Sequence, residues 1–457
     1  MTDAVRQKLN DSALARWTAL FLISITMFSS YYFYDIFSAI KATLQAQLGI
    51  DNSQYGAYYG AYSLLNAFGM ALLGGIILDK WGIRKTGSVF ISFVFIGVFM
   101  TAYGASDLFR QGGPGYSLFN SEFFLPQYSA ELKMMIIGRV LFGLGAETFY
   151  VVINKIVAKW FKGHELAFAF ALSLAFGRFG TAAVLVLSPE IVAHASSWDM
   201  AGWFGAMLGF ASLLSFIFYL IMDFRLDKSI ADASDDAAPE EEFHLSDVLD
   251  LFKNRSFIYI TMLCVTFYSA VFPFMGYTAD FLVNKFHFTE QLAGRVTTIL
   301  PFGTILFTPL FGWFTDKKGK NATVMIAGSF ILILVFLMFS LTSILPYIPL
   351  FFLGVAFSLV PAAMWPSVAR IVDQNKLGTA YGIMFSIQNW GLMLFPWIIG
   401  MVLDATNKGR PEGAPLDYTY AIVMLTGLGG LGLLFSFLLK RENARAGFGL
   451  EEPNRAD

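Results

Sequence analysis

Two ionisable residues, Glu147 and Arg178, stand inside long apolar runs on either side of a short basic turn at residues 159–164. Counted from Gly163, Glu147 lies 16 residues back and Arg178 lies 15 residues forward. At a helical rise of 1.5 Å per residue, each is about 22–24 Å from the turn, which is near the midplane of a bilayer or a little beyond it. A charge at that depth costs about 3–10 kcal/mol without a partner, so we expect both side chains to face a cavity or the interior of a helix bundle.

The two charges could act as the opposite poles of a binding site. A carboxylate accepts hydrogen bonds from an ammonium group, and a guanidinium binds a carboxylate through two N–H groups. The pair therefore suits a zwitterionic ligand, with Glu147 at one end and Arg178 at the other. The alternative is a structural salt bridge that fixes the packing of two helices, and the residues alone leave both interpretations open.

The composition is that of a polytopic membrane protein. Of 457 residues, 56% are hydrophobic and only 14% are charged, which is too apolar for a soluble domain of this size. The net charge of -2 and the dispersed basic residues give no sign of nucleic-acid binding. The single cysteine, Cys264, excludes an intramolecular disulfide, and the four histidines are scattered. Because no nucleotide-binding loop, nucleophile elbow or zinc-protease motif occurs, we expect no enzyme activity, no cofactor and no bound metal.

Twelve apolar segments are long enough to cross a bilayer as helices. They lie near residues 17–43, 54–78, 86–104, 133–158, 165–189, 198–222, 256–283, 290–315, 322–342, 344–371, 377–403 and 418–439. We therefore predict an all-α fold with twelve transmembrane helices. The loops on one side carry most of the Lys and Arg residues, whereas those on the other side carry only Arg110, Lys133, Lys285, Lys408 and Arg410. This asymmetry predicts that both termini are cytoplasmic.

A polar, acidic segment separates the sixth and seventh spans. We expect an amino-terminal half of six helices at residues 1–222, a cytoplasmic linker at 223–254 and a carboxy-terminal half of six helices at 255–457. A repeated pattern supports this division, because four residues recur at an offset of 237: Gly75, Asp79, Lys80 and Gly82 return as Gly312, Asp316, Lys317 and Gly319. Two copies of one unit imply a pseudo-twofold axis along the membrane normal and a central path between the halves.

The repeated pattern, continued by Arg84 and Lys85, resembles the signature loop of the major facilitator superfamily. The run Gly138-Arg139-Val-Leu-Phe-Gly143 is similar to the fourth-helix motif of the same superfamily. The resemblance implies two pseudo-symmetric six-helix halves, transport by alternating access, and gating roles for Gly75, Asp79, Lys80, Gly82, Arg84, Arg139, Asp316 and Gly319. It further implies that Asp79 closes the cytoplasmic face by meeting the amino end of the eleventh span near Gly378.

Other segments resemble the branch of the superfamily that contains lysosomal dipeptide transporters. They run through most of the membrane domain: Tyr31 to Asp35, Gly138 to Glu147, Trp160 to Leu166, Arg178, Val271 to Phe274, Trp365-Pro366 and Leu377 to Asn389. This resemblance implies dipeptides as substrates. It assigns Glu147 to the amino terminus of the peptide and Arg178 to its carboxyl terminus.

Further polar and aromatic residues belong to the expected substrate site. Tyr268 and Asn389 lie about as deep as the charged pair, so we expect them to line the cavity, the alternative being ordinary hydrogen bonds between helices. Three more come from the segments with the dipeptide-branch resemblance: Tyr34, Trp365 and Gln388. Asp35 and Asp280 lie nearer the outer ends of their spans, and we expect them to be interfacial groups that water reaches.

Together these features predict a monomeric dipeptide transporter whose partners are its substrate and the lipid bilayer. We expect facilitated, uncoupled transport, because a Glu147 that stays ionised beside Arg178 is a poor proton carrier. The alternatives are a proton-coupled symporter of a small organic anion or amino acid, and a receptor or scaffold that has kept the fold without transport. The amino terminus has no acidic dileucine sorting signal, and the three Asn-x-Ser/Thr sequons fall on the predicted cytoplasmic side, which favours a bacterial inner membrane or a similar plasma membrane.

Overall fold

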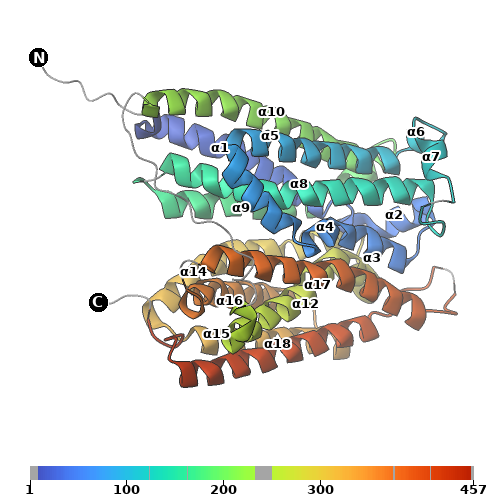
Figure 1. Cartoon of the computed structure of the whole chain (residues 1–457). Helices are drawn as coiled ribbons and strands as arrows, with labels where there is room; N and C mark the ends of the chain where they lie inside the picture. The colour runs from blue at the N-terminus through green and yellow to red at the C-terminus, as the bar shows by residue number, and fades with distance from the viewer. Residues whose placement is uncertain are drawn as a thin grey trace, which may run out of the picture.

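The computed structural model describes residues 9–122, 124–161, 163–231, 250–373, 376–411 and 413–453. Within these ranges the regular elements are helices, and the long ones run side by side in two stacked layers (Figure 1). One layer contains α1 (Ala13–Tyr34), α5 (Met70–Ala105), α8 (Ala130–Phe161), α9 (Leu166–His194) and α10 (Met200–Ala231). The other contains α12 (Arg255–Phe286), α14 (Ile299–Lys318), α15 (Asn321–Leu341), α16 (Tyr347–Ile371), α17 (Leu377–Thr406) and α18 (Thr419–Ala446). Shorter helices are α2 (Lys41–Leu48), α3 (Asn52–Gly60), α4 (Leu64–Ala67), α6 (Asp107–Arg110), α7 (Tyr116–Phe119) and α13 (Glu290–Thr297).

Eleven helical stretches of the described chain are long and apolar enough to cross a membrane. One of them, Met70–Ala105, is interrupted at Gly82, where φ is 74° and ψ is 173°. Glycine takes this backbone conformation readily and other residues do not, and here it turns the chain back on itself. Helix α5 therefore contains the end of the second span and the whole of the third. With this division, the twelve-helix all-α fold expected from the sequence is confirmed.

The second span is assembled from several pieces and is not one continuous helix over residues 54–78. It starts at α3, where Asp51 and Gln54 form a capping box, and continues through a 3-10 turn at Ala61–Ser63 and through α4. It then bends at Gly69, where φ is 87°, before α5 begins. The prediction was wrong in this detail because apolar periodicity reports burial and does not register a local break in a buried helix.

Glycines on α8 let it approach its neighbours closely. A Cβ added at Gly143 would lie 1.9 Å from the carbonyl oxygen of Tyr62, and one at Gly145 would lie 2.6 Å from the backbone nitrogen of Val94. Small residues at such crossings allow transmembrane helices to associate through van der Waals contact. This close approach fixes α8 against the second and third spans, and it holds Glu147 beside Tyr62.

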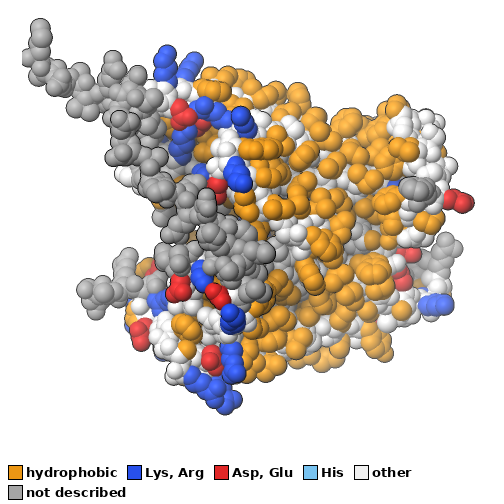
Figure 2. Space-filling model, in the orientation of Figure 1, with side chains coloured by type: hydrophobic (Ala, Val, Ile, Leu, Met, Phe, Trp, Pro, Cys, Tyr) orange, Lys and Arg blue, Asp and Glu red, His pale blue; other side chains and the backbone are white. Residues whose placement is uncertain are grey.

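The two layers meet tightly at the end that lies opposite the start of α1. There α3 packs on α17: a Cβ at Gly56 would lie 2.2 Å from the carbonyl oxygen of Pro396, and one at Gly400 would lie 2.1 Å from that of Asn52. At the opposite end, where α1 begins and α18 finishes, Lys and Arg side chains gather beside a broad hydrophobic band (Figures 1 and 2). A hydrophobic belt with a basic edge is the surface that a membrane-spanning protein presents.

The connection between the layers starts later than we expected. Helix α10 continues to Ala231, and the described chain resumes at Asp250, so most of the predicted linker at 223–254 lies outside the described residues. Hydrogen bonds from Lys253 and Lys376 lower the pKa of the exposed Asp250 carboxyl to about 2. These bonds connect the chain just before α12 to the residue before α17. The division into six-helix halves at 1–222 and 255–457 stays a prediction.

Candidate substrate-binding site

A cavity of about 630 Å³ lies between the two layers. Helices α1, α5, α8 and α9 form its wall on one side, and α12, α16 and α17 form it on the other. Its lining runs from Tyr34 and Tyr62 towards Gly75 and Gly378, near the basic end of the molecule. The structure brings all seven predicted substrate residues to this wall: Tyr34, Glu147, Arg178, Tyr268, Trp365, Gln388 and Asn389. Their contact with a substrate stays a prediction.

Glu147 projects from α8 into the cavity. Its Oε1 accepts a hydrogen bond of 2.8 Å from the hydroxyl of Tyr62, which belongs to the broken part of the second span. Sequence reasoning missed Tyr62. The signal that could have found it is the spacing of tyrosines at 55, 58, 59 and 62, which places them on one face of a helix. Within the described residues, no ion pair to Glu147 is formed.

Arg178 projects from α9 into the same cavity. Its guanidinium lies over two aromatic rings, 5.5 Å from the centroid of Tyr31 on α1 and 5.2 Å from that of Phe357 on α16. Cation–π contacts of this kind hold a planar guanidinium without using its N–H groups. Among the described residues no hydrogen bond or ion pair occupies those donors, so they remain available to a ligand.

The salt-bridge interpretation of the charged pair is not what the structure shows. Glu147 bonds to Tyr62 and Arg178 lies between aromatic rings, and no ion pair joins the two side chains in the described chain. The ring of Tyr31 contacts Arg178 and also packs beside Tyr150 on α8, with ring centroids 5.6 Å apart. Both charges face one cavity with separate protein supports.

The opposite wall of the cavity is aromatic. Trp365 donates its Nε1–H to the hydroxyl of Tyr268 at 3.1 Å, and its ring stacks on Phe385 with centroids 4.8 Å apart. Tyr381 donates its hydroxyl to the carbonyl oxygen of Trp365 at 3.0 Å. These bonds fix the orientation of Trp365 across α12, α16 and α17.

Two neighbouring amides on α17 contribute polar atoms to the wall. Gln388 accepts a hydrogen bond from the thiol of Cys264 at 3.3 Å, so the single cysteine acts as a buried donor. Asn389 donates to the carbonyl oxygen of Phe385 in its own helix at 3.0 Å, and its Oδ1 is buried without a partner among the described residues. The amide of Asn389 therefore makes no bond between helices.

A buried arginine contacts the end of α1, next to the cavity residue Tyr34. Arg139 donates to the carbonyl oxygens of Phe33 at 3.2 Å and Tyr34 at 2.6 Å, which are among the last in α1. A cation is favoured at the carboxyl end of a helix, where unpaired carbonyl groups concentrate negative charge. Its guanidinium also lies over four tyrosine rings of the same layer. Arg139 thus anchors the end of α1, and its expected gating role stays a prediction.

The two aspartates expected at the water interface are buried. Asp35 is only 3% exposed and accepts a hydrogen bond of 2.7 Å from the hydroxyl of Tyr59. Asp280 is 4% exposed and forms an ion pair of 2.8 Å with Lys41. The expectation was wrong for both: Asp35 lies in the wall of the cavity, Asp280 lies at the closed end, and each carboxylate has a buried donor.

The gate contact expected of Asp79 is not formed in this structure. Asp79 pairs instead with Lys155 of α8 in its own layer, at 2.8 Å, where the Asp79 side chain is exposed and that of Lys155 is half-buried. Gly75 and Gly378, on either side of the expected contact, both line the cavity. The cavity lining thus reaches this end of the molecule, and among the described residues no hydrogen bond or ion pair joins Asp79 to α17. Lys80 is exposed beside it.

The remaining gating candidates hold the turns at the basic edge. Gly82 makes the turn between the second and third spans, and Arg84 beyond it pairs with Asp223 at 2.7 Å and with Asp227. In the second copy, Asp316 is exposed and Gly319, with φ of 68°, lies against the backbone of Glu452. The carboxy-terminal segment thus packs against this turn, and the backbone nitrogen of Lys320 donates to the carbonyl oxygen of Glu451 at 3.1 Å. Within the described ranges, no group of three or more His, Cys, Asp or Glu side chains converges, so no candidate metal site is found there.

Two helical layers that enclose a charged cavity between them define a membrane transporter. The family model of the Major Facilitator Superfamily matches residues 19–396 and 274–455, and the chain belongs to this superfamily, whose members are transporters and not enzymes. The lysosomal dipeptide transporter MFSD1 of Mus musculus is 31% identical over 400 residues, which cover 85% of this chain and 80% of the relative. The hexuronate transporter of Bacillus subtilis (strain 168) is 21% identical over 384 residues, which cover 80% of this chain and 82% of the relative. A solved bacterial homologue of the human lysosomal transporter Spinster, in an inward-facing and unoccupied conformation, aligns with a TM-score of 0.65 at 14% identity and covers 95% of this chain and 98% of that chain.

Proposed function

We propose that this protein carries dipeptides across a membrane by alternating access, as a facilitated and uncoupled transporter. The observation that carries the proposal is the presence of Glu147 and Arg178 in the wall of one cavity, each without an ion-pair partner among the described residues. Two opposite charges that do not pair with each other are costly in the membrane interior. A zwitterionic substrate lowers this cost by supplying a partner to both.

The chemistry of a dipeptide fits this arrangement. Its ammonium and carboxylate groups lie about 5–7 Å apart when the two residues are nearly extended. Glu147 would accept hydrogen bonds from the ammonium group, and Arg178, held flat between rings, would bind the carboxylate through two N–H groups. The volume of about 630 Å³ is in the usual range for small-molecule sites. The side chains of the peptide would contact the aromatic wall that contains Tyr268 and Trp365.

Alternating access would come from rocking of the two layers about this cavity. Packing of α3 on α17 closes one end, and the lining at Gly75 and Gly378 opens the other towards the basic edge. Under the positive-inside rule, the open end is cytoplasmic and both termini lie in the cytoplasm. We assign the moving units to residues 1–222 and 255–457, and the protein to the inner membrane of a bacterium as a monomer.

Uncoupled transport also follows from the zwitterionic character of a dipeptide. A dipeptide neutralises Glu147 and Arg178 by itself, so the loaded carrier needs no additional proton. The second candidate is proton-coupled transport of a small organic anion, in which Arg178 binds the anion and Glu147 carries the proton. The separation of Glu147 from Arg178 favours this candidate, because a carboxylate without a cation beside it can accept a proton more readily. A receptor or scaffold has no use for these two charges.

Counterflow and uptake in proteoliposomes test the proposal. Purified protein should exchange a labelled dipeptide for an unlabelled one, and a protonophore should leave the equilibrium level unchanged. Accumulation of the dipeptide against its gradient, abolished by the protonophore, would contradict uncoupled transport. Uptake of an organic acid that dipeptides fail to inhibit would favour the second candidate.

A further inference from the structure

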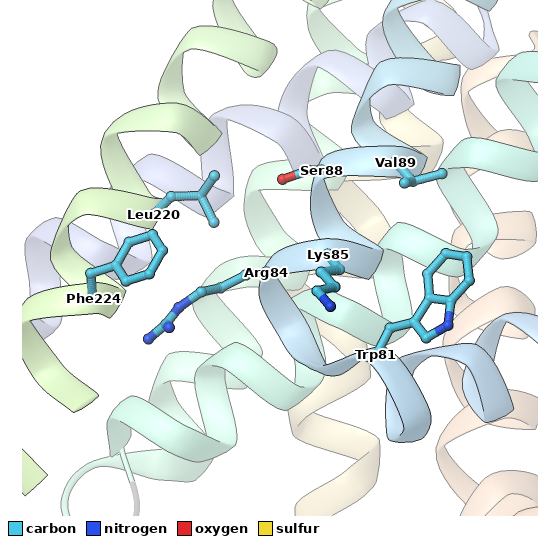
Figure 3. A pocket seen from close by; sticks show the side chains of 7 residues that line it. All are labelled: Trp81, Arg84, Lys85, Ser88, Val89, Leu220 and Phe224. Carbon is cyan, nitrogen blue, oxygen red and sulfur yellow. The ribbon is translucent and has the colours of Figure 1, made fainter. Parts of the chain in front are cut away.

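A second hollow lies between α5 and α10 of the first layer (Figure 3), and it shares no lining residue with the substrate cavity. Its volume is about 530 Å³, and its wall is made by the stretch of α5 on both sides of the turn at Gly82 and by the second half of α10. The side chains that line it are Trp81, Arg84, Lys85, Ser88, Val89, Leu220 and Phe224. We call it the edge groove. Because it opens outward beside the hydrophobic belt, membrane lipid is the molecule that meets it.

Among the described residues around the edge groove, one basic side chain has no ion-pair partner. Arg84 and Lys159 together face Asp223 and Asp227, and each cation contacts both carboxylates, so this cluster of four is balanced. Arg84 also lies over the ring of Phe224 at 3.9 Å. Lys85 stands outside the cluster, exposed in the middle of the groove, and forms no ion pair or hydrogen bond with the described residues (Figure 3).

The groove has a polar end and an apolar continuation. Ser88, whose hydroxyl makes no bond within the described chain, lies one helical turn from Lys85 on the same face of α5. Beyond them the exposed side chains are apolar: Val89 on α5, and Ile217, Ile221 and Phe224 on α10. A ligand that matches this surface has an anionic group for Lys85 and Ser88 and hydrocarbon chains for the apolar strip.

We propose that the edge groove binds an anionic glycerophospholipid, with the phosphate group at Lys85 and Ser88 and an acyl chain along α10. Trp81 is 52% exposed and precedes the turn at Gly82 at the basic edge, and tryptophan is favoured at the level of lipid headgroups. A zwitterionic lipid matches less well, because its own cation would lie beside Lys85. The site is independent of the substrate that the cavity takes.

Native mass spectrometry of the purified full-length protein tests this site with phosphatidylglycerol and phosphatidylcholine of equal chain length. We expect phosphatidylglycerol to remain bound in preference to phosphatidylcholine. Lys85→Ala should reduce its binding by about five-fold, which is the contribution of one basic residue near a membrane surface. Lys85→Arg should retain binding, and Lys318→Ala, which removes an exposed lysine of the other layer, should match the wild type.

Two further measurements distinguish lipid binding from the binding of a free anion and from loss of binding through misfolding. Inorganic phosphate at millimolar concentration should not displace phosphatidylglycerol, and displacement would show a headgroup-only anion site instead of a lipid site. Ser88→Leu fills the groove while keeping the lysine, and it should also reduce binding, with an unchanged elution volume in size-exclusion chromatography. Wild-type binding in both Lys85→Ala and Ser88→Leu, or equal retention of the two lipids by the wild type, would overturn the proposal.

Discussion

Lys41 of α2 and Asp280 of α12 form a buried ion pair of 2.8 Å that joins the two layers at the closed end. Their side chains are 0% and 3% exposed. Lys41 also donates to Oδ1 of Asn52 at 2.7 Å, and Tyr418 donates its hydroxyl to Asp280. Because the pair links residues of different layers, it has to separate when that end opens.

We predict that removing one member of this pair favours opening of the closed end. Lys41→Met leaves the carboxylate of Asp280 buried without its cation, at a cost of about 3–5 kcal/mol to the closed form. The thermal midpoint should fall, and a cysteine introduced at Met275 in the cavity wall should react faster with a membrane-impermeant maleimide added from that side. Buried Cys264 provides a low background.

The matched control for Lys41→Met is Lys408→Met, which changes an exposed lysine on the same side. It should leave both the midpoint and the labelling rate unchanged. The double variant Lys41→Met with Asp280→Leu removes both buried charges, so it should recover part of the lost stability. A single variant that is as stable as the wild type would show that the pair does not hold the closed end.

The carboxy-terminal segment provides a prediction about stability. Glu451 accepts bonds from the backbone nitrogen of Thr323 at 2.9 Å and from its hydroxyl at 2.6 Å, and so caps the first turn of α15. Loss of the charge in Glu451→Gln should lower the free energy of unfolding by about 1 kcal/mol, because a carboxylate at a helix amino terminus is favoured by its unpaired N–H groups. Thermal unfolding followed by tryptophan fluorescence measures the change. Glu452→Gln, which leaves the backbone contacts of Glu452 in place, is the control and should unfold like the wild type.

Sequence reasoning placed the spans and four of the wall residues because both depend on distance along one helix; these four are Glu147, Arg178, Tyr268 and Asn389. The other three, Tyr34, Trp365 and Gln388, came from the resemblance to the dipeptide branch. The depth of Glu147 and Arg178 follows from counting residues back and forward from the turn at Gly163, and the structure keeps that turn between α8 and α9. The apolar segments are similarly local, so the fold was predictable except for the break in the second span.

Contacts between distant segments could not be predicted in this way. Lys41 and Asp280 are separated by 239 residues, and nothing in either neighbourhood marks the other as a partner. The same holds for Asp79, whose partner in this structure is set by which end of the molecule is closed. A single sequence encodes both conformations of a transporter, and so it does not say which contacts are formed in one of them.

The signature loop supplies a prediction about rate. If Asp79 meets the amino end of α17 when the basic end closes, Asp79→Asn loses a charge-assisted hydrogen bond in that form only. Transport should slow by about ten-fold while dipeptide affinity changes by no more than a few fold. Turnover in proteoliposomes and binding in detergent measure the two quantities separately. Lys408→Ala, which alters an exposed lysine at the other end of the molecule, should transport normally, and a wild-type rate for Asp79→Asn would rule out the gate.

The most discriminating prediction concerns the two charges of the cavity. Charge-assisted hydrogen bonds contribute about 1.5–3 kcal/mol, so Glu147→Gln or Arg178→Gln should weaken dipeptide binding by about ten- to a hundred-fold. Binding is measured by isothermal titration calorimetry with free and capped dipeptides. Gln388→Glu is a useful comparison, since it adds a charge to the same wall without removing either pole.

Capping one end of the peptide identifies which charge it meets. An amino-acetylated dipeptide should bind the wild type weakly and lose little more with Glu147→Gln, because the same contact cannot be lost twice. A dipeptide with an amidated carboxyl terminus should show this non-additivity with Arg178→Gln and not with Glu147→Gln. If the two caps act additively with both substitutions, the charges stabilise the protein without touching the peptide ends. If free and capped dipeptides bind the wild type equally well, or an organic acid outcompetes them, the cavity is an anion site centred on Arg178.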